Sequence, residues 1–263
     1  MYSHRPRRRF GQNFLIDAGY IQRIVEAIGP HRSDRVVEIG PGLGALTGPL
    51  LEHLDSLHVV EIDRDIVAGL VARFPGERLV VHQGDALEFD FAAMGSGLRL
   101  VGNLPYNIST PMLFHTARFA ACIRDCHFML QEEVVDRMAA QPGGKRFGRL
   151  SVMLQYRFRV EKLFDVPPGV FRPVPRVNSA MARLTPHTVL PAPAQDEALL
   201  AQVVSKAFSQ RRKTLRNALA GYASAEDLAA LGLDPRLRPE NLSLEDFVCL
   251  ANTIARRARQ TCS

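Results

Sequence analysis

One stretch decides the fold of this 263-residue chain: Val36-Val37-Glu38-Ile39-Gly40-Pro41-Gly42-Leu43-Gly44. The apolar run Val36–Ile39 is typical of a buried strand. The glycines that follow permit a sharp turn and let a ligand approach backbone N–H groups. A helical pattern, Leu46–Leu54, comes next. The stretch therefore predicts a strand, a tight glycine loop and a helix in succession.

The same alternation of strands and helices continues along the chain. Strands separated by helices imply right-handed βαβ units and a doubly wound sheet. Two later apolar runs, Phe158–Phe164 and Ser179–Leu184, are joined by a proline-rich connection that is too short for a crossover helix, so we expect them to pair antiparallel. The other predicted strands are Leu57–Ile62, Leu79–Val81, Leu98–Val101 and His127–Leu130, with helices at Asp65–Phe74, Pro111–Phe119 and Glu132–Ala140.

Helices are also predicted at both ends of this alternating region. Near the N-terminus, Asp17 can cap a helix that Gly29-Pro30 ends. Three prolines within Pro186–Ala194 indicate a linker, and only helical patterns follow it. A glycine-rich basic loop, Gln141–Arg149, follows the predicted helix Glu132–Ala140. The apolar stripe of the N-terminal helix is Ile21, Ile24, Val25 and Ile28.

Charge narrows the class of partner. The net charge of +6 and the pI of about 9.4 predict a polyanionic partner. Basic residues gather at Arg5 and Arg7–Arg9, and again between Ala198 and Ala225, where no acid occurs. A basic run is usually only a solvated face, so neither patch is decisive alone. The second patch consists of Lys206, Arg211, Arg212, Lys213 and Arg216.

No segment predicts a membrane-spanning or secreted protein. No apolar stretch approaches the roughly 20 residues of a membrane span, and no apolar signal core follows the basic N-terminus. Four cysteines are too few for a disulfide framework in a chain of this length, and Cys122 and Cys126 have no second pair with which to hold zinc. We expect a cytoplasmic protein with free thiols, no metal site and no membrane partner.

The spacing of the glycine loop indicates the kind of cofactor. It is Gly-x-Gly-x-Gly, not the Gly-x-Gly-x-x-Gly of nicotinamide and flavin sites. The shorter loop suits a cofactor without phosphates, such as S-adenosylmethionine, although the spacing alone fits a glycine turn without a ligand equally well. Glu61 ends the next strand, where a carboxylate can accept hydrogen bonds from ribose hydroxyls, with Asp63 as the alternative.

Asp85 ends the third strand and can accept a hydrogen bond from the amine of a cofactor's adenine. A lone acid at a strand end is more often a helix cap or a solvated loop residue. Ligand-binding groups at three consecutive strand ends nevertheless favour a cofactor site. S-adenosylmethionine is the preferred cofactor, and NAD is the alternative.

A second loop, Asn103-Leu104-Pro105-Tyr106, follows the predicted strand Leu98–Val101. It offers an amide, backbone carbonyls that the proline keeps out of a helix, and an aromatic face. An amine on a flat ring could be hydrogen-bonded there and stacked on Tyr106. Alone, the four residues fit a strand-to-helix turn with a buried tyrosine better, so the rest of the chain must decide.

With both loops and Asp85, the chain resembles the ribosomal RNA adenine N6,N6-dimethyltransferase family, above all its bacterial branch that acts on small-subunit rRNA. Gly11–Leu15 is similar to the family's N-terminal cofactor lid, and Phe171–Ser179 to its late substrate motif. Phe208–Asn217 and Arg238–Ser243 are similar to parts of its C-terminal helical domain. The late motif departs from the family pattern twice, with Val174 in place of proline and Asn178 in place of aspartate.

The resemblance implies a seven-stranded, Rossmann-like methyltransferase sheet whose last strand is antiparallel, followed by a small all-helical domain. The implied boundaries are a basic arm and cofactor lid at 1–16, a catalytic domain at 17–185, a linker at 186–194 and an RNA-binding helical domain at 195–263.

The resemblance also implies roles for individual residues. The Asn103 side chain and the Leu104 carbonyl accept hydrogen bonds from the target amine, and Tyr106 stacks on the base. Phe171 is implied as a second stacking aromatic, although a core phenylalanine fits its sequence context equally well. The implied cofactor contacts are Asn13, Leu15, Gly40, Gly42, Glu61, Asp85, Ala86 and Asn103.

The implied activity is dimethylation of two adjacent adenosines in the 3′-terminal hairpin of small-subunit (16S) rRNA, within an assembling 30S particle, by a monomeric enzyme that uses S-adenosylmethionine. The alternatives are a DNA or large-subunit rRNA adenine methyltransferase, a nicotinamide oxidoreductase, and an RNA-binding assembly factor whose catalysis is secondary. The glycine spacing disfavours the oxidoreductase, and the C-terminal segments disfavour the DNA enzyme.

Overall fold

The computed structural model describes residues 12–261, which form two compact units. The first unit comprises the chain to Val135 together with Arg159–Pro186. The second comprises Asp136–Phe158 and the chain from His187 onward. The basic residues at Arg5 and Arg7–Arg9 lie outside the described residues.

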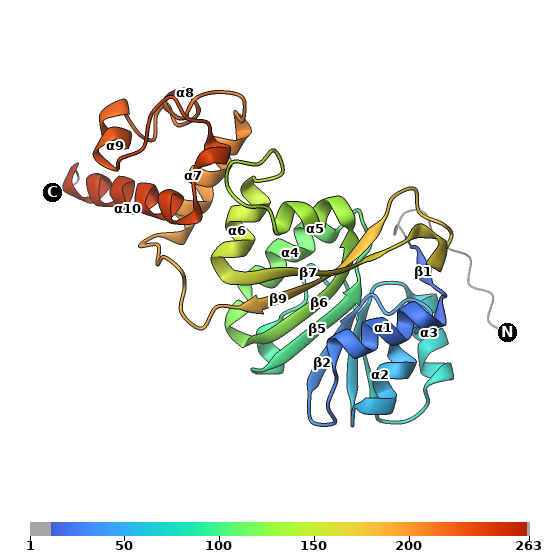
Figure 1. Cartoon of the computed structure of the whole chain (residues 1–263). Helices are drawn as coiled ribbons and strands as arrows, with labels where there is room; N and C mark the ends of the chain where they lie inside the picture. Colours follow the sequence, from blue (N-terminus) through green and yellow to red (C-terminus); the bar gives the residue numbers. More distant parts are fainter. Residues whose placement is uncertain (1–11, 262–263) are drawn as a thin grey trace. The chain divides into compact units, whose positions relative to one another are not determined.

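A seven-stranded sheet organises the first unit, and Figure 1 shows it flanked by helices. The strand order is β4-β3-β2-β5-β6-β9-β7. The first five pair in parallel, whereas β9 is antiparallel to β6. The strands are β2 (Arg35–Ile39), β3 (Leu57–Glu61), β4 (Leu79–Gln83), β5 (Leu98–Asn103), β6 (Ile123–Gln131), β7 (Phe158–Val166) and β9 (Ser179–Pro186). All seven predicted strands and the reversed last one are confirmed.

Five helices belong to the segments that connect or precede these strands. They are α1 (Ala18–Ile28), α2 (Thr47–His53), α3 (Arg64–Arg73), α4 (Ser109–Arg118) and α5 (Glu132–Met138). Short 3₁₀ turns are η2 (Phe91–Met94), η3 (Ala120–Cys122), η4 (Pro168–Val170) and, in the second unit, η5 (Pro239–Asn241).

The start and end of α1 follow from its sequence. The Asp17 side chain accepts a hydrogen bond from the Tyr20 amide at 2.9 Å, and Gly29 ends the helix in a left-handed conformation with φ +56°. The buried face of α1 packs with α2, α3 and the sheet in one apolar core. Each fully buried aliphatic side chain there stabilises the fold by about 1.5–3 kcal/mol. The predicted cap, stripe and stop are confirmed.

A small two-stranded sheet was not expected from the sequence. β1 (Phe14–Leu15) pairs antiparallel with β8 (Phe171–Arg172), and Leu15 stands opposite Phe171. The pairing joins segments that are more than 150 positions apart. Local periodicity contains no signal for such short strands.

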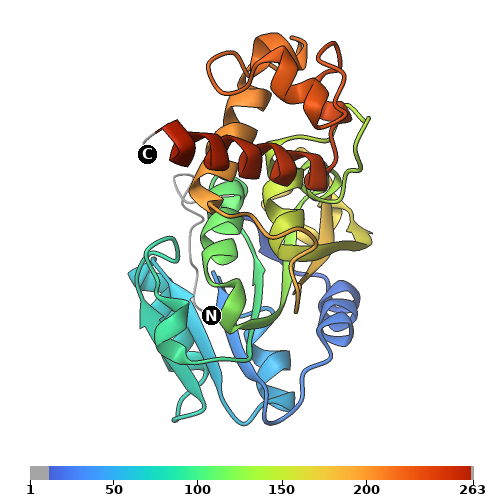
Figure 2. The same ribbon diagram turned by 90° about the vertical axis from the view of Figure 1, so that its left-hand side faces the viewer.

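The second unit is helical. Its helices are α6 (Arg149–Arg157), α7 (Glu197–Ser209), α8 (Leu215–Ala218), α9 (Ala225–Ala230) and α10 (Leu244–Thr261), and α10 lies across α7 in Figures 1 and 2. Phe147, Val152 and Tyr156 are buried in its core. The sequence placed residues 136–158 in the catalytic domain, whereas these contacts place them with the C-terminal helices.

Two kinds of feature are absent from the part of the chain that the structure describes. No helix there is long and apolar enough to cross a membrane. No cluster of three or more histidine, cysteine or acidic side chains there is arranged to hold a metal ion.

Candidate functional site

The sheet order brings the sequence-predicted site residues to one edge. β4, β3, β2 and β5 are parallel neighbours, so their carboxyl ends meet at the same edge. The chain reverses its direction of winding between β2 and β5, which is where open α/β sheets bind ligands. The glycine loop, Glu61, Asp85 and Asn103 all lie at or just after these strand ends.

The glycine loop needs its glycines for backbone geometry. Gly40, Gly42 and Gly44 have φ values of +64°, +54° and +80°, a region that side chains with a Cβ rarely adopt. A Cβ on Gly42 would lie 3.1 Å from the Phe14 ring. The loop is therefore tightly turned and in close contact with the N-terminal segment that the sequence predicts to be a cofactor lid.

Two buried carboxylates lie beside this loop. Thr47 donates a hydrogen bond to the Glu38 carboxylate at 2.6 Å, and burial raises the pKa of Glu38 to about 7, with a further contribution from the charge of Glu61. Burial also raises the pKa of Glu61, whose carboxylate accepts a hydrogen bond from the Asp63 amide at 2.8 Å. The sequence did not single out Glu38 as a site residue.

Asp85 and Asp63 each make a local turn contact. Asp85 accepts a hydrogen bond from the Leu87 amide at 2.9 Å, and Asp63 caps α3 through the Asp65 amide at 3.1 Å. The Gly84 amide donates to the Glu61 carbonyl at 3.0 Å, which ties the two strand ends together. Asp85 is only partly buried, so its carboxylate is accessible to a ligand, and Ala86 beside it is buried.

Gly102 brings the second loop against the first. A Cβ at Gly102 would lie 2.6 Å from the Ile39 carbonyl oxygen, closer than any side chain can approach. The glycine therefore allows the end of β5 to pack directly on the end of β2. Beyond it, Pro105 lies about 4.0 Å from where a Cβ on Gly40 would be. The sequence does not mark Gly102 as a site residue, because only the neighbouring strand reveals the need for glycine there.

Asn103 has a fixed amide orientation. Its Nδ2 donates a hydrogen bond to the backbone carbonyl of Asn13 at 3.0 Å. A carbonyl can only accept, so the amide cannot be turned the other way without bringing two oxygens together. The Asn103 Oδ1 is consequently the group directed away from Asn13. It is an acceptor at the strand edge, as the predicted role requires.

The rest of the loop is held by two further contacts. The Leu104 amide donates to the Met129 carbonyl at 3.1 Å, and the Tyr106 hydroxyl lies 2.7 Å from Ser179 Oγ. Burial raises the pKa of Tyr106, so this phenol stays neutral at physiological pH. Tyr106 is only partly buried, which leaves part of the side chain accessible.

The structure places the side chains of Phe171 and Leu15 where they cannot take the roles that the resemblance implied. Phe171 is fully buried and Leu15 is 5 % exposed, and both pack in the core of the first unit. The Phe171 ring has no exposed face with which to stack on a base, so the core interpretation replaces the stacking role here. Leu15 likewise offers no side-chain surface to a cofactor. Their backbones pair instead and hold the segment that carries Asn13.

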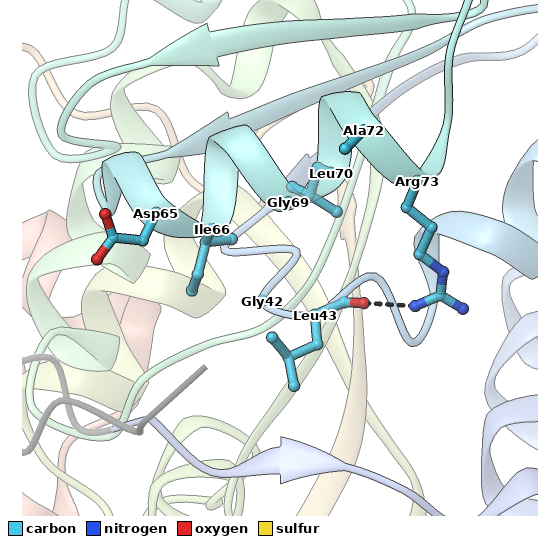
Figure 3. A pocket seen from close by; sticks show the side chains of 8 residues that line it. All are labelled: Gly42, Leu43, Asp65, Ile66, Gly69, Leu70, Ala72 and Arg73. Atoms are coloured by element: carbon cyan, nitrogen blue, oxygen red, sulfur yellow. Dashed lines mark hydrogen bonds between the residues drawn. The ribbon is translucent and has the colours of Figure 1, made fainter. Parts of the chain in front are cut away.

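A cavity of about 420 Å³ opens between the glycine loop and α3, and Figure 3 shows the side chains that line it. The Arg73 guanidinium donates to the Leu43 carbonyl at 2.7 Å across one end. Asn103, Tyr106 and Asp85 do not line this cavity. The site is therefore defined by the strand ends, and the cavity adjoins it only at Gly42 and Leu43.

The polar groups at this edge fit S-adenosylmethionine. Carboxylates at two strand ends can accept from a nucleoside, and the turned glycine loop allows close approach of a ligand to the backbone. The buried Glu38 and Glu61 disfavour a pyrophosphate but not a cationic sulfonium. Chemically, the edge combines a nucleoside site with a neutral hydrogen-bond acceptor, Asn103 Oδ1, next to it.

Comparisons with known proteins give a consistent result. Residues 3–256 match the family described as ribosomal RNA adenine dimethylase. The chain is 60 % identical over 262 residues to the ribosomal RNA small subunit methyltransferase A of Laribacter hongkongensis, covering 99 % of this chain and 100 % of the relative. It is 59 % identical over 258 residues to the protein of that name from Aromatoleum aromaticum, covering 98 % and 97 %.

Two solved structures illustrate the similarity of the fold. A dimethyladenosine transferase from Plasmodium falciparum superposes with a TM-score of 0.79 at 23 % identity, covering 93 % of this chain and 98 % of that one. The 23S rRNA methyltransferase ErmE superposes with a TM-score of 0.73 at 23 % identity, covering 92 % and 100 %. At this identity the likeness establishes the fold, a Rossmann-like methyltransferase sheet with a helical unit.

Proposed function

The chain belongs to the ribosomal RNA adenine dimethylase family, and from this premise we propose that it dimethylates N6 of two adjacent adenosines in the 3′-terminal hairpin of small-subunit rRNA. It is a methyltransferase that uses S-adenosylmethionine and acts on ribosomal RNA. The proposed substrate particle is an assembling 30S subunit, and the proposed enzyme is a cytoplasmic monomer.

The observation that carries the proposal is the orientation of Asn103. An adenine amine is a poor nucleophile because its lone pair is delocalised into the ring. Hydrogen bonds from its two hydrogens to Asn103 Oδ1 and the Leu104 carbonyl would draw those hydrogens out of the ring plane. The lone pair is then localised on nitrogen and can be aimed at the methyl donor. An asparagine suffices because the task is to accept a hydrogen bond and not to titrate.

The other residues of the site bind and orient the reactants. When bound, S-adenosylmethionine supplies an electrophilic methyl group. Glu61 and Asp85 are the proposed acceptors for its ribose hydroxyls and adenine amine, and Gly40 and Gly42 allow its close approach. Tyr106 is the proposed stacking partner of the target base. The methylated amine loses its proton readily, so no strong base is required in the site.

In this proposal Phe171 holds in place the N-terminal segment that is predicted to be the cofactor lid. Its backbone pairs with Leu15, two residues beyond Asn13, whose carbonyl holds the Asn103 amide. The stacking interaction with the base is therefore assigned to Tyr106 alone. The departures at Val174 and Asn178 lie in the exposed part of the same motif, away from this pairing.

The proposal can be tested by primer extension across the 3′ hairpin of small-subunit rRNA. We expect rRNA from wild-type cells to give a strong stop at two adjacent adenosines, and rRNA from cells lacking the gene to give none. Restoring the gene should restore the stop, whereas the Asn103→Ala gene should not. An unchanged stop in the deletion strain would refute the proposed substrate. A stop lost from large-subunit rRNA instead would favour the alternative RNA target.

A further inference from the structure

The glycine-rich segment 141–149, here called the basic loop, leads into α6 of the second unit and ends at its first residue (Figure 1). It carries three exposed cations, Lys145, Arg146 and Arg149, and no acid. Gly143 has a φ of +89° and Gly144 follows it, so the chain there has unusual conformational freedom. A loop of this composition is expected to be flexible unless other residues hold it.

Arg211, just after α7, holds the basic loop at its centre. Its Nε donates to the Glu240 carboxylate at 2.9 Å, and its terminal nitrogen donates to the carbonyls of Lys145 and Phe147, the latter at 3.1 Å. The Arg211 side chain is 40 % exposed and that of Glu240 is 18 % exposed. The guanidinium thus joins three segments of the second unit.

Two more contacts hold the ends of the loop. The Gly143 amide donates to the backbone carbonyl of Glu240 at 2.6 Å. Phe147 is almost fully buried in the helical core, where it meets the Phe208 ring edge-on at 6.3 Å. Between these anchors only Lys145 and Arg146 project from the loop as exposed side chains, and Arg146 is paired with Asp136 at 2.6 Å.

The residues of the basic run Arg211-Arg212-Lys213 therefore have different roles. Arg211 is turned onto the basic loop, whereas Arg212 and Lys213 are exposed. Arg211 belongs to the motif Phe208–Asn217 and Glu240 to the motif Arg238–Ser243, and neither motif contributes to the site in the first unit. The two motifs meet at the contact between Arg211 and Glu240. Here the pair is called the Arg211–Glu240 clamp.

We infer that the Arg211–Glu240 clamp holds the basic loop in a conformation that presents Lys145 to a phosphate group of structured RNA. The inference rests on the proposed RNA substrate. Ordering a glycine-rich loop in advance reduces the entropy that binding must otherwise overcome. Arg211 and Glu240 are positioning residues in this account, and Lys145 is the group that meets phosphate.

The decisive variant is Glu240→Ala, because two explanations predict opposite signs. Removal of an acid makes the protein more basic, so simple electrostatics predicts tighter binding to RNA. Release of the basic loop predicts weaker binding. We expect the Kd for unmethylated small ribosomal subunits from the deletion strain to rise about fivefold, equivalent to about 1 kcal/mol. Hydrogen exchange of the loop amides should rise in the same variant.

Two matched variants complete the experiment. Glu245→Ala removes an exposed acid near the same position of the chain without touching the clamp, and should bind as tightly as the wild type or slightly more tightly. Lys145→Gln should lower the slope of log Kd against log salt by about 1. In the Lys145→Gln background, Glu240→Ala should cost little further affinity, because the loop no longer presents the lysine.

The melting temperature and S-adenosylmethionine binding of each variant control for folding. Unchanged or tighter binding by Glu240→Ala with an exposed loop would overturn the inference, as would a wild-type salt slope for Lys145→Gln. Either result leaves the proposed function intact, because that function fails only if the wild-type protein does not methylate the hairpin.

Discussion

Two loops, one in each unit, are both held in place by residues far away in the sequence. Neutral hydrogen bonds to the Asn13 and Met129 carbonyls and with Ser179 Oγ hold Asn103–Tyr106, which lies beside buried carboxylates. A charged pair, Arg211 and Glu240, holds the basic loop, whose cations are exposed. The first loop therefore depends on the position of one amide, and the second depends on charge and salt.

Among the variants that keep Asn103, the largest effect on rate is expected for Gly102→Ala. The new Cβ would lie 2.6 Å from the Ile39 carbonyl, so the end of β5 must move and carry Asn103 with it. A displacement near 1 Å costs about 100-fold in rate, so we expect kcat to fall by about that factor or more, with the Kd for the small subunit little changed. Steady-state kinetics with saturating RNA measure this.

The basic loop supplies the matched control for Gly102→Ala. A Cβ at Gly144 would meet nothing closer than the Gln141 carbonyl at 3.6 Å, so Gly144→Ala should leave kcat unchanged. Equal losses of kcat in the two variants would contradict the contrast between the loops.

The next effect, on the free energy of unfolding, is expected for Glu38→Gln. Burial raises the folded-state pKa of Glu38 to about 7 from 4.5, so the folded protein holds this proton more tightly than the unfolded chain does. The wild type therefore loses stability as pH rises from about 4.5 to about 7. The glutamine variant lacks this loss and can still accept the hydrogen bond from Thr47.

Urea unfolding of the cofactor-free protein at several pH values tests this. At pH 8 Glu38→Gln should be more stable than the wild type by about 3 kcal/mol. The difference should vanish below about pH 4.5. Lys145→Gln, in the basic loop, should show no such change with pH. A constant difference for Glu38→Gln across the pH range would be inconsistent with a buried, titrating carboxyl group.

The smallest effect is expected for Tyr106→Phe. The change removes the hydroxyl that lies 2.7 Å from Ser179 Oγ and keeps the ring that is proposed to stack on the base. One neutral hydrogen bond contributes about 1 kcal/mol, so kcat/KM should fall about fivefold. Ser179→Ala should have a similar effect, and the double variant should be no worse than either single one. Strictly additive losses would show that the two groups act separately.

The sequence predicted what local patterns encode. Runs of apolar residues located every strand of the large sheet, and the order of strands and helices brought Glu61, Asp85 and Asn103 to one edge. Asp17 and Gly29 marked the ends of α1 because capping depends on residues close in sequence. These features need no knowledge of distant contacts.

The features that were missed depend on contacts between distant segments. Gly102 looks like any glycine until β2 is packed beside it. The resemblance implied a stacking role for Phe171, and its pairing with Leu15, more than 150 positions away, is not visible in the sequence. Arg211 looked like one more exposed cation until Glu240 and the basic loop were placed around it. The membership of residues 136–158 in the helical unit has the same origin.

The most direct test of the catalytic account is the single-turnover rate of Asn103→Ala with saturating S-adenosylmethionine and unmethylated small subunits. If Asn103 Oδ1 localises the lone pair of the target amine, the rate should fall about 10²–10³-fold, as for loss of other preorganised hydrogen-bonding groups. The Kd for RNA should stay within about twofold, because the basic loop is untouched. Turnover near the wild-type rate would contradict the account.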